Sequence, residues 1–200
     1  MRAGYCAVGL LVTFACANAE ENHPSKTLAI LYNFEQPYSQ SALKDTEREL
    51  KALIGDTVKL EWHDRTDFEG RSTFSTIVVL KFLGNCDPRS DGSFRGSKDS
   101  WLARMRVFEG VVLPFGDVNC DRVRSLVSDG ALGARPSDKG FGRALARVLA
   151  HELYHFLTQS TEHAAQGLEK PAFSRSDLVL DSLHLDRQQL GRLSHSMLLR

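Results

Sequence analysis

The sequence lacks an excess of either charge, since its 200 residues include 25 basic and 25 acidic side chains. It has no basic run and no interleaving of basic with aromatic residues, so nothing in it points to nucleic-acid binding. It also has no internal repeat and no low-complexity segment. No apolar stretch reaches the roughly 20 residues that a helix needs to span a bilayer. These absences favour a globular protein without a membrane span.

The N-terminus has the three parts of a secretory signal peptide. Arg2 supplies a short positive region, residues 6–17 form an apolar run, and residues 17–19 read Ala-Asn-Ala, a small-x-small cleavage site. Residues 1–19 are therefore predicted to be removed, and the mature protein is predicted to be secreted or periplasmic. The mature chain, residues 20–200, has a length that suits a single domain with a substantial core.

Cysteine is scarce, with only 4 in the chain. Cys6 and Cys16 leave with the signal peptide. The alternative is a lipoprotein acylated at Cys16, against which the aromatic Phe14 counts because such sites usually carry small residues. Cys86 and Cys120 are then the only mature cysteines, and in an oxidising compartment they most simply form one disulfide. They match a metal site less well, because neither lies in a Cys-x-x-Cys pair.

The first part of the mature chain alternates strand and helix patterns. Runs rich in β-branched and apolar residues predict strands, and apolar residues at helical spacing predict a helix between the first two. The predicted strands are residues 27–34, 57–63, 74–83, 101–108 and 110–118, and the predicted helix is residues 39–54. This order indicates a βαβ unit in a mostly parallel sheet, followed by a hairpin that turns at Glu109 and Gly110.

The second part of the chain is predicted to be helical. Ser137 and Asp138 supply an N-cap signal for a long helix rich in Ala, Leu and Arg, although Gly140 and Gly142 weaken its first turn. Apolar residues occupy most sides of this helix, so it is predicted to be buried. A short helix opened by a capping signal at residues 174–177 and a last helix near residues 186–199 follow.

The buried helix carries the motif His151-Glu152-Leu153-Tyr154-His155. Residues four apart lie on one helix face, so His151 and His155 can direct ring nitrogens at one metal ion. Glu152 then lies beside the ion and can take a proton from a metal-bound water. The alternative is a core helix whose histidines make internal hydrogen bonds. Burial of two His and a Glu on one face without a partner is costly, which favours the metal site.

This order of elements, together with the motif, resembles the zincin metallopeptidases. The resemblance implies an α+β fold with a mixed β-sheet, a backing helix, the active-site helix and a small C-terminal helical subdomain. Within the zincins the chain is most similar to metzincins, because His163 follows the helix. It departs from their pattern at Thr158 and Thr161, where metzincins have a turn-forming Gly and the third His.

The resemblance also implies roles for individual residues. His151, His155 and His163 would bind Zn²⁺ with a water in the fourth position, and Glu152 would be the general base. A peptide substrate would pair with an edge strand within residues 101–107. The alternative third ligand is an acidic residue downstream, as in gluzincins or aspzincins; the candidates are Glu162, Glu169 and Asp177.

Two functions remain open from the sequence. The first is an exported zinc metallopeptidase that hydrolyses peptide bonds. The second is a zincin-fold protein that keeps its metal, has little or no proteolytic activity and binds a peptide or protein partner. The atypical spacing to His163 and the absence of Gly at position 158 motivate this second hypothesis.

Overall fold

The structure is a computed structural model. It describes residues 27–54, 57–70, 74–90, 100–128, 134–180 and 183–198. The predicted signal peptide, residues 1–19, and the alternative lipid site at Cys16 lie outside these ranges. None of the described helices is both long and apolar enough to cross a membrane.

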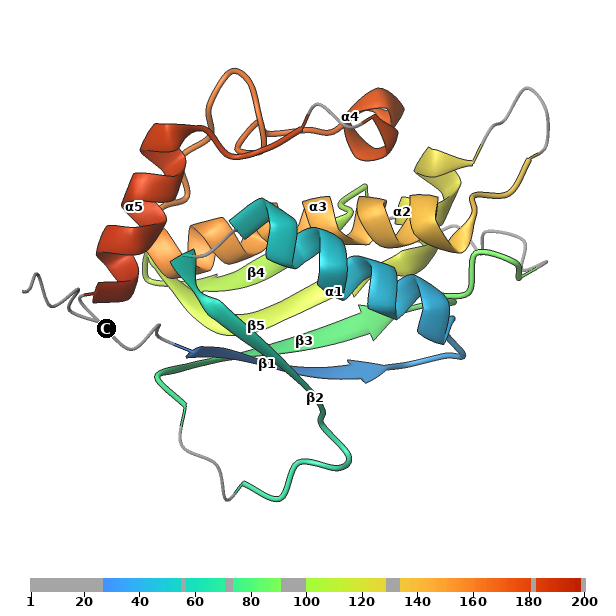
Figure 1. The fold of residues 1–200 in the computed structure, drawn as a ribbon, viewed down its shortest axis with the longest axis horizontal. Helices are drawn as coiled ribbons and strands as arrows, with labels where there is room; N and C mark the ends of the chain where they lie inside the picture. The colour runs from blue at the N-terminus through green and yellow to red at the C-terminus, as the bar shows by residue number, and fades with distance from the viewer. Residues whose placement is uncertain are drawn as a thin grey trace, which may run out of the picture.

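A five-stranded sheet forms one layer of the fold (Figure 1). Its strands are β1 (Thr27–Phe34), β2 (Lys59–Asp64), β3 (Thr76–Leu83), β4 (Ala103–Phe108) and β5 (Val111–Asn119), in the spatial order β2-β1-β3-β5-β4. All neighbours pair in parallel except β4, which runs antiparallel to β5 and lies at the sheet edge. The predicted mixed sheet, its hairpin and the edge position of residues 101–107 are confirmed.

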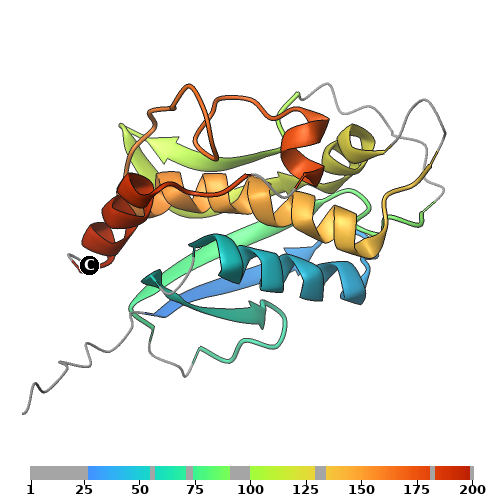
Figure 2. The same ribbon diagram turned by 45° about the horizontal axis from the view of Figure 1, so that its top comes forward.

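Two helices, α1 (Gln40–Ile54) and α3 (Asp138–Thr158), pack side by side on one face of the sheet (Figure 2). Strand β3 shows how its residues divide between the two faces. Its residues Val78, Leu80 and Phe82 are buried beneath the helices, whereas Ile77 and Lys81 on the opposite face are exposed. This alternation is typical of a sheet that buries one face. As predicted, α3 is buried along most of its length.

Helix α2 (Cys120–Val127) was not predicted from the sequence. It starts directly where β5 ends, and Asn119 caps it by accepting a hydrogen bond from the backbone N–H of Arg122. Val123 and Val127 face the core at helical spacing. The helix has only 8 residues, and the strand pattern before it hides its start, so Asn119 was the one local signal.

The predicted disulfide between Cys86 and Cys120 is present, with a Cα–Cα distance of 5.0 Å. It joins the chain just after β3 to the first residue of α2. A distance of this size is normal for an unstrained bridge. The bond therefore fixes α2, which borders the functional site described below, to the end of a central strand.

The C-terminal region contains α4 (Arg175–Val179) and α5 (Arg187–Leu198), at the positions that the sequence predicts. Buried Arg147 of α3 anchors this region by donating hydrogen bonds to the backbone oxygens of Asp177 and Leu180. Arg147 also forms an ion pair with Glu49 of α1. One side chain thus connects three helices, and its charge is compensated as burial requires.

Gly142 allows α1 and α3 to approach closely. A Cβ atom at this position would lie 2.5 Å from the backbone oxygen of Ala42 and 2.7 Å from the Cβ of Asp45. We therefore expect Gly142→Ala to lower the free energy of unfolding by about 1–3 kcal/mol, although Ala is the better helix former. Gly191→Ala in α5 is the control, because a Cβ atom added there would have no neighbour from another part of the described chain within 4 Å. This variant should raise the free energy of unfolding by up to about 1 kcal/mol. Urea denaturation of both variants tests this, and an unchanged or raised stability of Gly142→Ala would contradict the close approach.

Candidate metal centre

Helix α3 places two histidines of the motif against each other. His151 and His155 lie one turn apart on the same face, and each has 8% of its surface exposed. Their rings meet edge to face, with the two Nε2 atoms 3.0 Å apart. The helical spacing of four residues therefore produces the convergence of imidazoles that the motif predicts.

The outer nitrogen of each ring is held by a backbone oxygen. His151 Nδ1 lies 2.7 Å from the carbonyl oxygen of Leu168, and His155 Nδ1 lies 2.6 Å from that of Ser160. A carbonyl oxygen only accepts, so both Nδ1 atoms carry the proton and both Nε2 atoms carry a lone pair. Two lone pairs that face each other at 3.0 Å repel unless a cation lies between them. This is the tautomer and orientation that metal-binding histidines adopt.

Burial keeps both imidazoles neutral. It lowers the pKa of His151 to about 4, and it also lowers the pKa of His155; the carbonyl oxygens of Leu168 and Ser160 oppose the shift. The neighbouring histidines lower both pKa values further. Metal ligation needs neutral imidazole, so neither ring has to lose a proton at neutral pH.

His163 completes the cluster from the segment that follows α3. Its ring centroid lies 5.3 Å from that of His151 and 4.9 Å from that of His155. The three side chains each offer one nitrogen, and these atoms all lie within 4.8 Å of one another. Among the described residues, no other group of three His, Cys, Asp or Glu side chains converges in this way.

The chain returns His163 to the helix through Gln159, a residue with no signal in the sequence motif. Gln159 adopts the left-handed conformation, with φ 54° and ψ 34°, that a Gly usually supplies at the end of a helix. Its side-chain oxygen accepts a hydrogen bond from the N–H of Val112, and its amide group donates to the oxygens of Val112 and Phe156. These three bonds offset the cost of the conformation, so the missing Gly at position 158 does not prevent the turn.

Glu152 lies beside the histidines and bonds to the edge strand. Its Oε2 accepts a hydrogen bond of 2.9 Å from the backbone N–H of Met105 in β4. Burial raises the pKa of Glu152 to about 7, and the Met105 N–H only partly opposes this. A carboxyl group with such a pKa can both accept and release a proton near neutral pH, which is what a general acid–base catalyst requires.

The predicted acidic alternatives lie elsewhere among the described residues. Asp177 closes the capping box of α4 and pairs with Lys170. Glu162 is exposed, and Glu169 is buried near Tyr154. None of the three belongs to the converging group. Tyr154 is 1% exposed and lies in the core.

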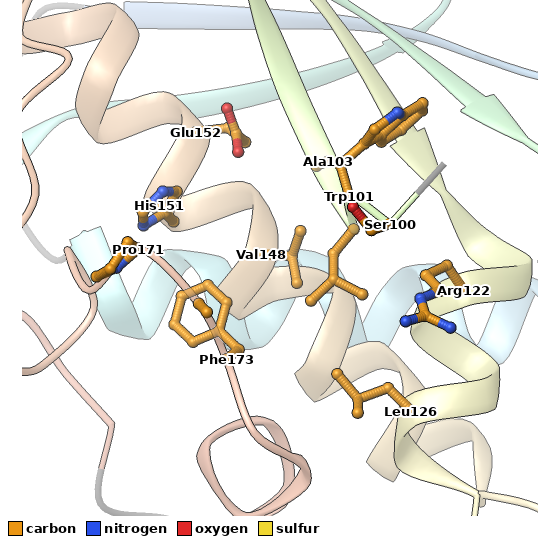
Figure 3. Close-up of a pocket in the computed structure, with 12 residues that line it drawn as sticks. Ser100, Trp101, Ala103, Arg122, Leu126, Val148, His151, Glu152, Pro171 and Phe173 are labelled. Carbon is orange, nitrogen blue, oxygen red and sulfur yellow. The ribbon is translucent and has the colours of Figure 1, made fainter. Parts of the chain in front are cut away.

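Two of the hollows that border the histidine cluster also border Glu152. The first has a volume of about 200 Å³ and runs beside β4, past Met105 and Val107, to Thr161 and His163. The second has a volume of about 240 Å³ and extends from His151 and Glu152 toward α2 (Figure 3). The site is therefore open to a molecule that lies along the edge strand and reaches into both.

Comparison with solved structures shows a zincin-like fold. The chain is similar to archaemetzincin from Methanopyrus kandleri, with a TM-score of 0.50, 13% identity and coverage of 90% of this chain and 98% of that chain. It is also similar to a zinc-dependent peptidase from Methanocorpusculum labreanum, with a TM-score of 0.53, 10% identity and coverage of 83% and 99%. No protein-family model matches the chain, and no curated protein matches its sequence. The predicted α+β fold with its mixed sheet is confirmed.

Proposed function

We propose that the protein is a zinc-dependent peptidase in which His151, His155 and His163 bind the metal and Glu152 is the general base. The observation that carries the proposal is the facing pair of Nε2 lone pairs, 3.0 Å apart and fixed by carbonyl oxygens on the far side of each ring. A third imidazole and the half-buried carboxyl group of Glu152 lie at the same place.

The donor set fits zinc. Zinc–nitrogen bonds of about 2.0–2.1 Å in a tetrahedral site separate two ligand nitrogens by about 3.3 Å. The observed 3.0 Å between the Nε2 atoms of His151 and His155 is close to this value, and His163 is within reach by a small movement of its exposed side chain. Three protein ligands leave a fourth position open, as in catalytic rather than structural zinc sites. The two similar structures, an archaemetzincin and a zinc-dependent peptidase, support this assignment.

Zinc bound there would supply a Lewis acid that polarises the peptide carbonyl and acidifies the attacking water. Glu152 would take the proton from that water and later give it to the leaving amine. The Met105 N–H fixes the Glu152 carboxylate through Oε2, which leaves Oε1 for the proton.

The substrate would bind as an added strand on β4. This strand ends the sheet, so apart from the Met105 N–H, which donates to Glu152, its outer backbone groups are without a neighbouring strand among the described residues. An extended peptide there gains main-chain hydrogen bonds, while its side chains enter the hollows on either side of the histidines. This is the geometry of peptide recognition by strand addition.

We also propose that the protein is exported. The signal-like residues 1–19 and the small-x-small sequence that ends them support this. The Cys86–Cys120 disulfide adds an argument of a different kind, since such bonds persist in oxidising compartments.

Metal analysis of purified protein tests the assignment of ligands. We expect about one zinc per chain in residues 20–200, and a strong loss of zinc in His151→Ala and His163→Ala. The affinity should fall by more than the roughly 10- to 100-fold that loss of an outer-shell partner costs, because a direct ligand is removed. His195→Ala, which removes an exposed histidine of α5, is the matched control and should keep its zinc.

The outcomes separate the alternatives. Zinc retained in His163→Ala but lost in His151→Ala would move the third ligand to another residue. A parent protein that takes up no zinc when zinc is supplied would exclude the peptidase. Zinc uptake without cleavage of a peptide library would favour the metal-binding protein with a peptide partner.

A further inference from the structure

We propose that Arg122 makes the hollow beside Glu152 a subsite for a carboxylate group of the peptide substrate. The inference rests on the proposed function, because it assigns specificity to the same site. The hollow is the one that extends from His151 and Glu152 toward α2, and we call it the α2 subsite.

Among the described residues that line the α2 subsite, Arg122 is the one cation. Figure 3 shows it across the hollow from His151 and Glu152. Its backbone N–H donates to the cap residue Asn119. Its guanidinium group makes no hydrogen bond or ion pair with any residue in the described part of the chain. Its five N–H donors are therefore available for a ligand, and a guanidinium group matches a carboxylate in shape.

The neighbouring arginine of α2 shows the contrast. Arg124 pairs with Asp121 and donates to the backbone oxygens of Asn85 and Asp87, so its role is to hold α2 in place. Arg122 lies on the same short helix and makes none of these contacts. The helix thus uses one arginine for its own structure and presents the other to the hollow.

The walls of the α2 subsite favour a carboxylate on a short aliphatic stem. Leu102, Leu126, Val148 and Phe173 line the space between Glu152 and Arg122. Next to apolar walls the attraction between a carboxylate and a guanidinium group is stronger than in open water. The aliphatic part of the ligand would pack on these side chains while its charged end reaches Arg122. A glutamate or aspartate side chain, or the carboxylate at the end of a peptide, has this chemistry.

Peptide binding to the zinc-loaded Glu152→Gln protein tests the inference without turnover. The probes are N-acetylated, amidated alanine hexapeptides that carry a single Glu or a single Gln, measured by calorimetry. The Glu peptide should bind about 10- to 100-fold more tightly, the range expected for a hydrogen-bonded charge. A third peptide of alanines alone with a free C-terminal carboxylate distinguishes the two sources: tighter binding of this peptide assigns the subsite to the chain end.

Variants of Arg122 show whether this residue is responsible. Arg122→Gln should remove the preference for a carboxylate, and Arg122→Glu should replace it by a preference for a Lys peptide. Arg48→Gln, which makes the same charge change on an exposed part of α1, is the matched control and should keep the preference. Equal binding of the Glu, Gln and free-acid peptides, or a preference that survives Arg122→Gln, would overturn the inference. A parent protein that cleaves peptides without preferring a carboxylate would overturn the inference and leave the proposed peptidase function standing. A parent protein that prefers a carboxylate but cleaves no peptide would support the subsite and exclude the peptidase function.

Discussion

Glu152→Gln is expected to lower kcat for peptide hydrolysis by about 10²- to 10⁴-fold. The amide cannot take a proton from water, but its oxygen can still accept the hydrogen bond from Met105 that holds the side chain at 2.9 Å. The substitution keeps the shape of the residue and leaves the three histidines untouched. Zinc content should therefore equal that of the parent protein, and the loss should appear in kcat rather than in peptide binding.

Glu162→Gln is the matched control for this experiment. Glu162 is exposed and directly precedes His163, so the change removes a nearby charge without reaching the Met105 contact. Its kcat should remain within about twofold of the parent value. A Glu152→Gln protein that still hydrolyses peptides at the parent rate would exclude Glu152 as the base.

Removal of the disulfide is expected to have the largest effect on stability. The bond between Cys86 and Cys120 closes a loop with a sequence separation of 34 residues. The loop entropy that it removes from the unfolded chain corresponds to about 3–4 kcal/mol. The double variant Cys86→Ser/Cys120→Ser, which leaves no free thiol in the mature chain, should melt about 8–15 °C below the parent protein.

Differential scanning calorimetry with and without reductant provides the control. Reductant should lower the Tm of the parent protein toward that of the double variant and should leave the double variant unchanged. Equal Tm values of parent and variant under oxidising conditions would show that the bond does not form in the folded protein.

The elements that the sequence predicted are those whose signals are local. α3 has a cap at Ser137 and helical periodicity, and both act within a few residues. The hairpin turn has φ angles of 49° at Glu109 and 79° at Gly110, and Gly is the residue that suits such angles. The capping box at Ser174 and Asp177 is equally local, and the structure contains it.

The contacts that complete the site have no local signal. Met105 reaches Glu152, and Gln159 reaches Val112, each across 47 residues of sequence. In both cases one partner is a backbone group, which every residue possesses, so the side-chain pattern cannot reveal it. The left-handed backbone at Gln159 is stabilised by side-chain hydrogen bonds to Val112 of β5 and Phe156 of α3, and a sequence pattern based on Gly misses it.

Gln159 also couples the motions of two segments. One is the loop that carries His163, and the other is the β4–β5 hairpin, to which the Gln159 side chain is hydrogen-bonded. Val112 lies in the part of β5 that extends beyond its pairing with β3, and the Gln159 carboxamide bonds to both its N–H and its C=O as a neighbouring strand would. Any event that anchors one end of this connection reduces the freedom of the other. Metal capture by His163 would thus rigidify the hairpin on which the proposed peptide substrate would lie. By thermodynamic reciprocity a peptide bound to the hairpin would tighten the hold on the metal, so the two ligands would bind cooperatively.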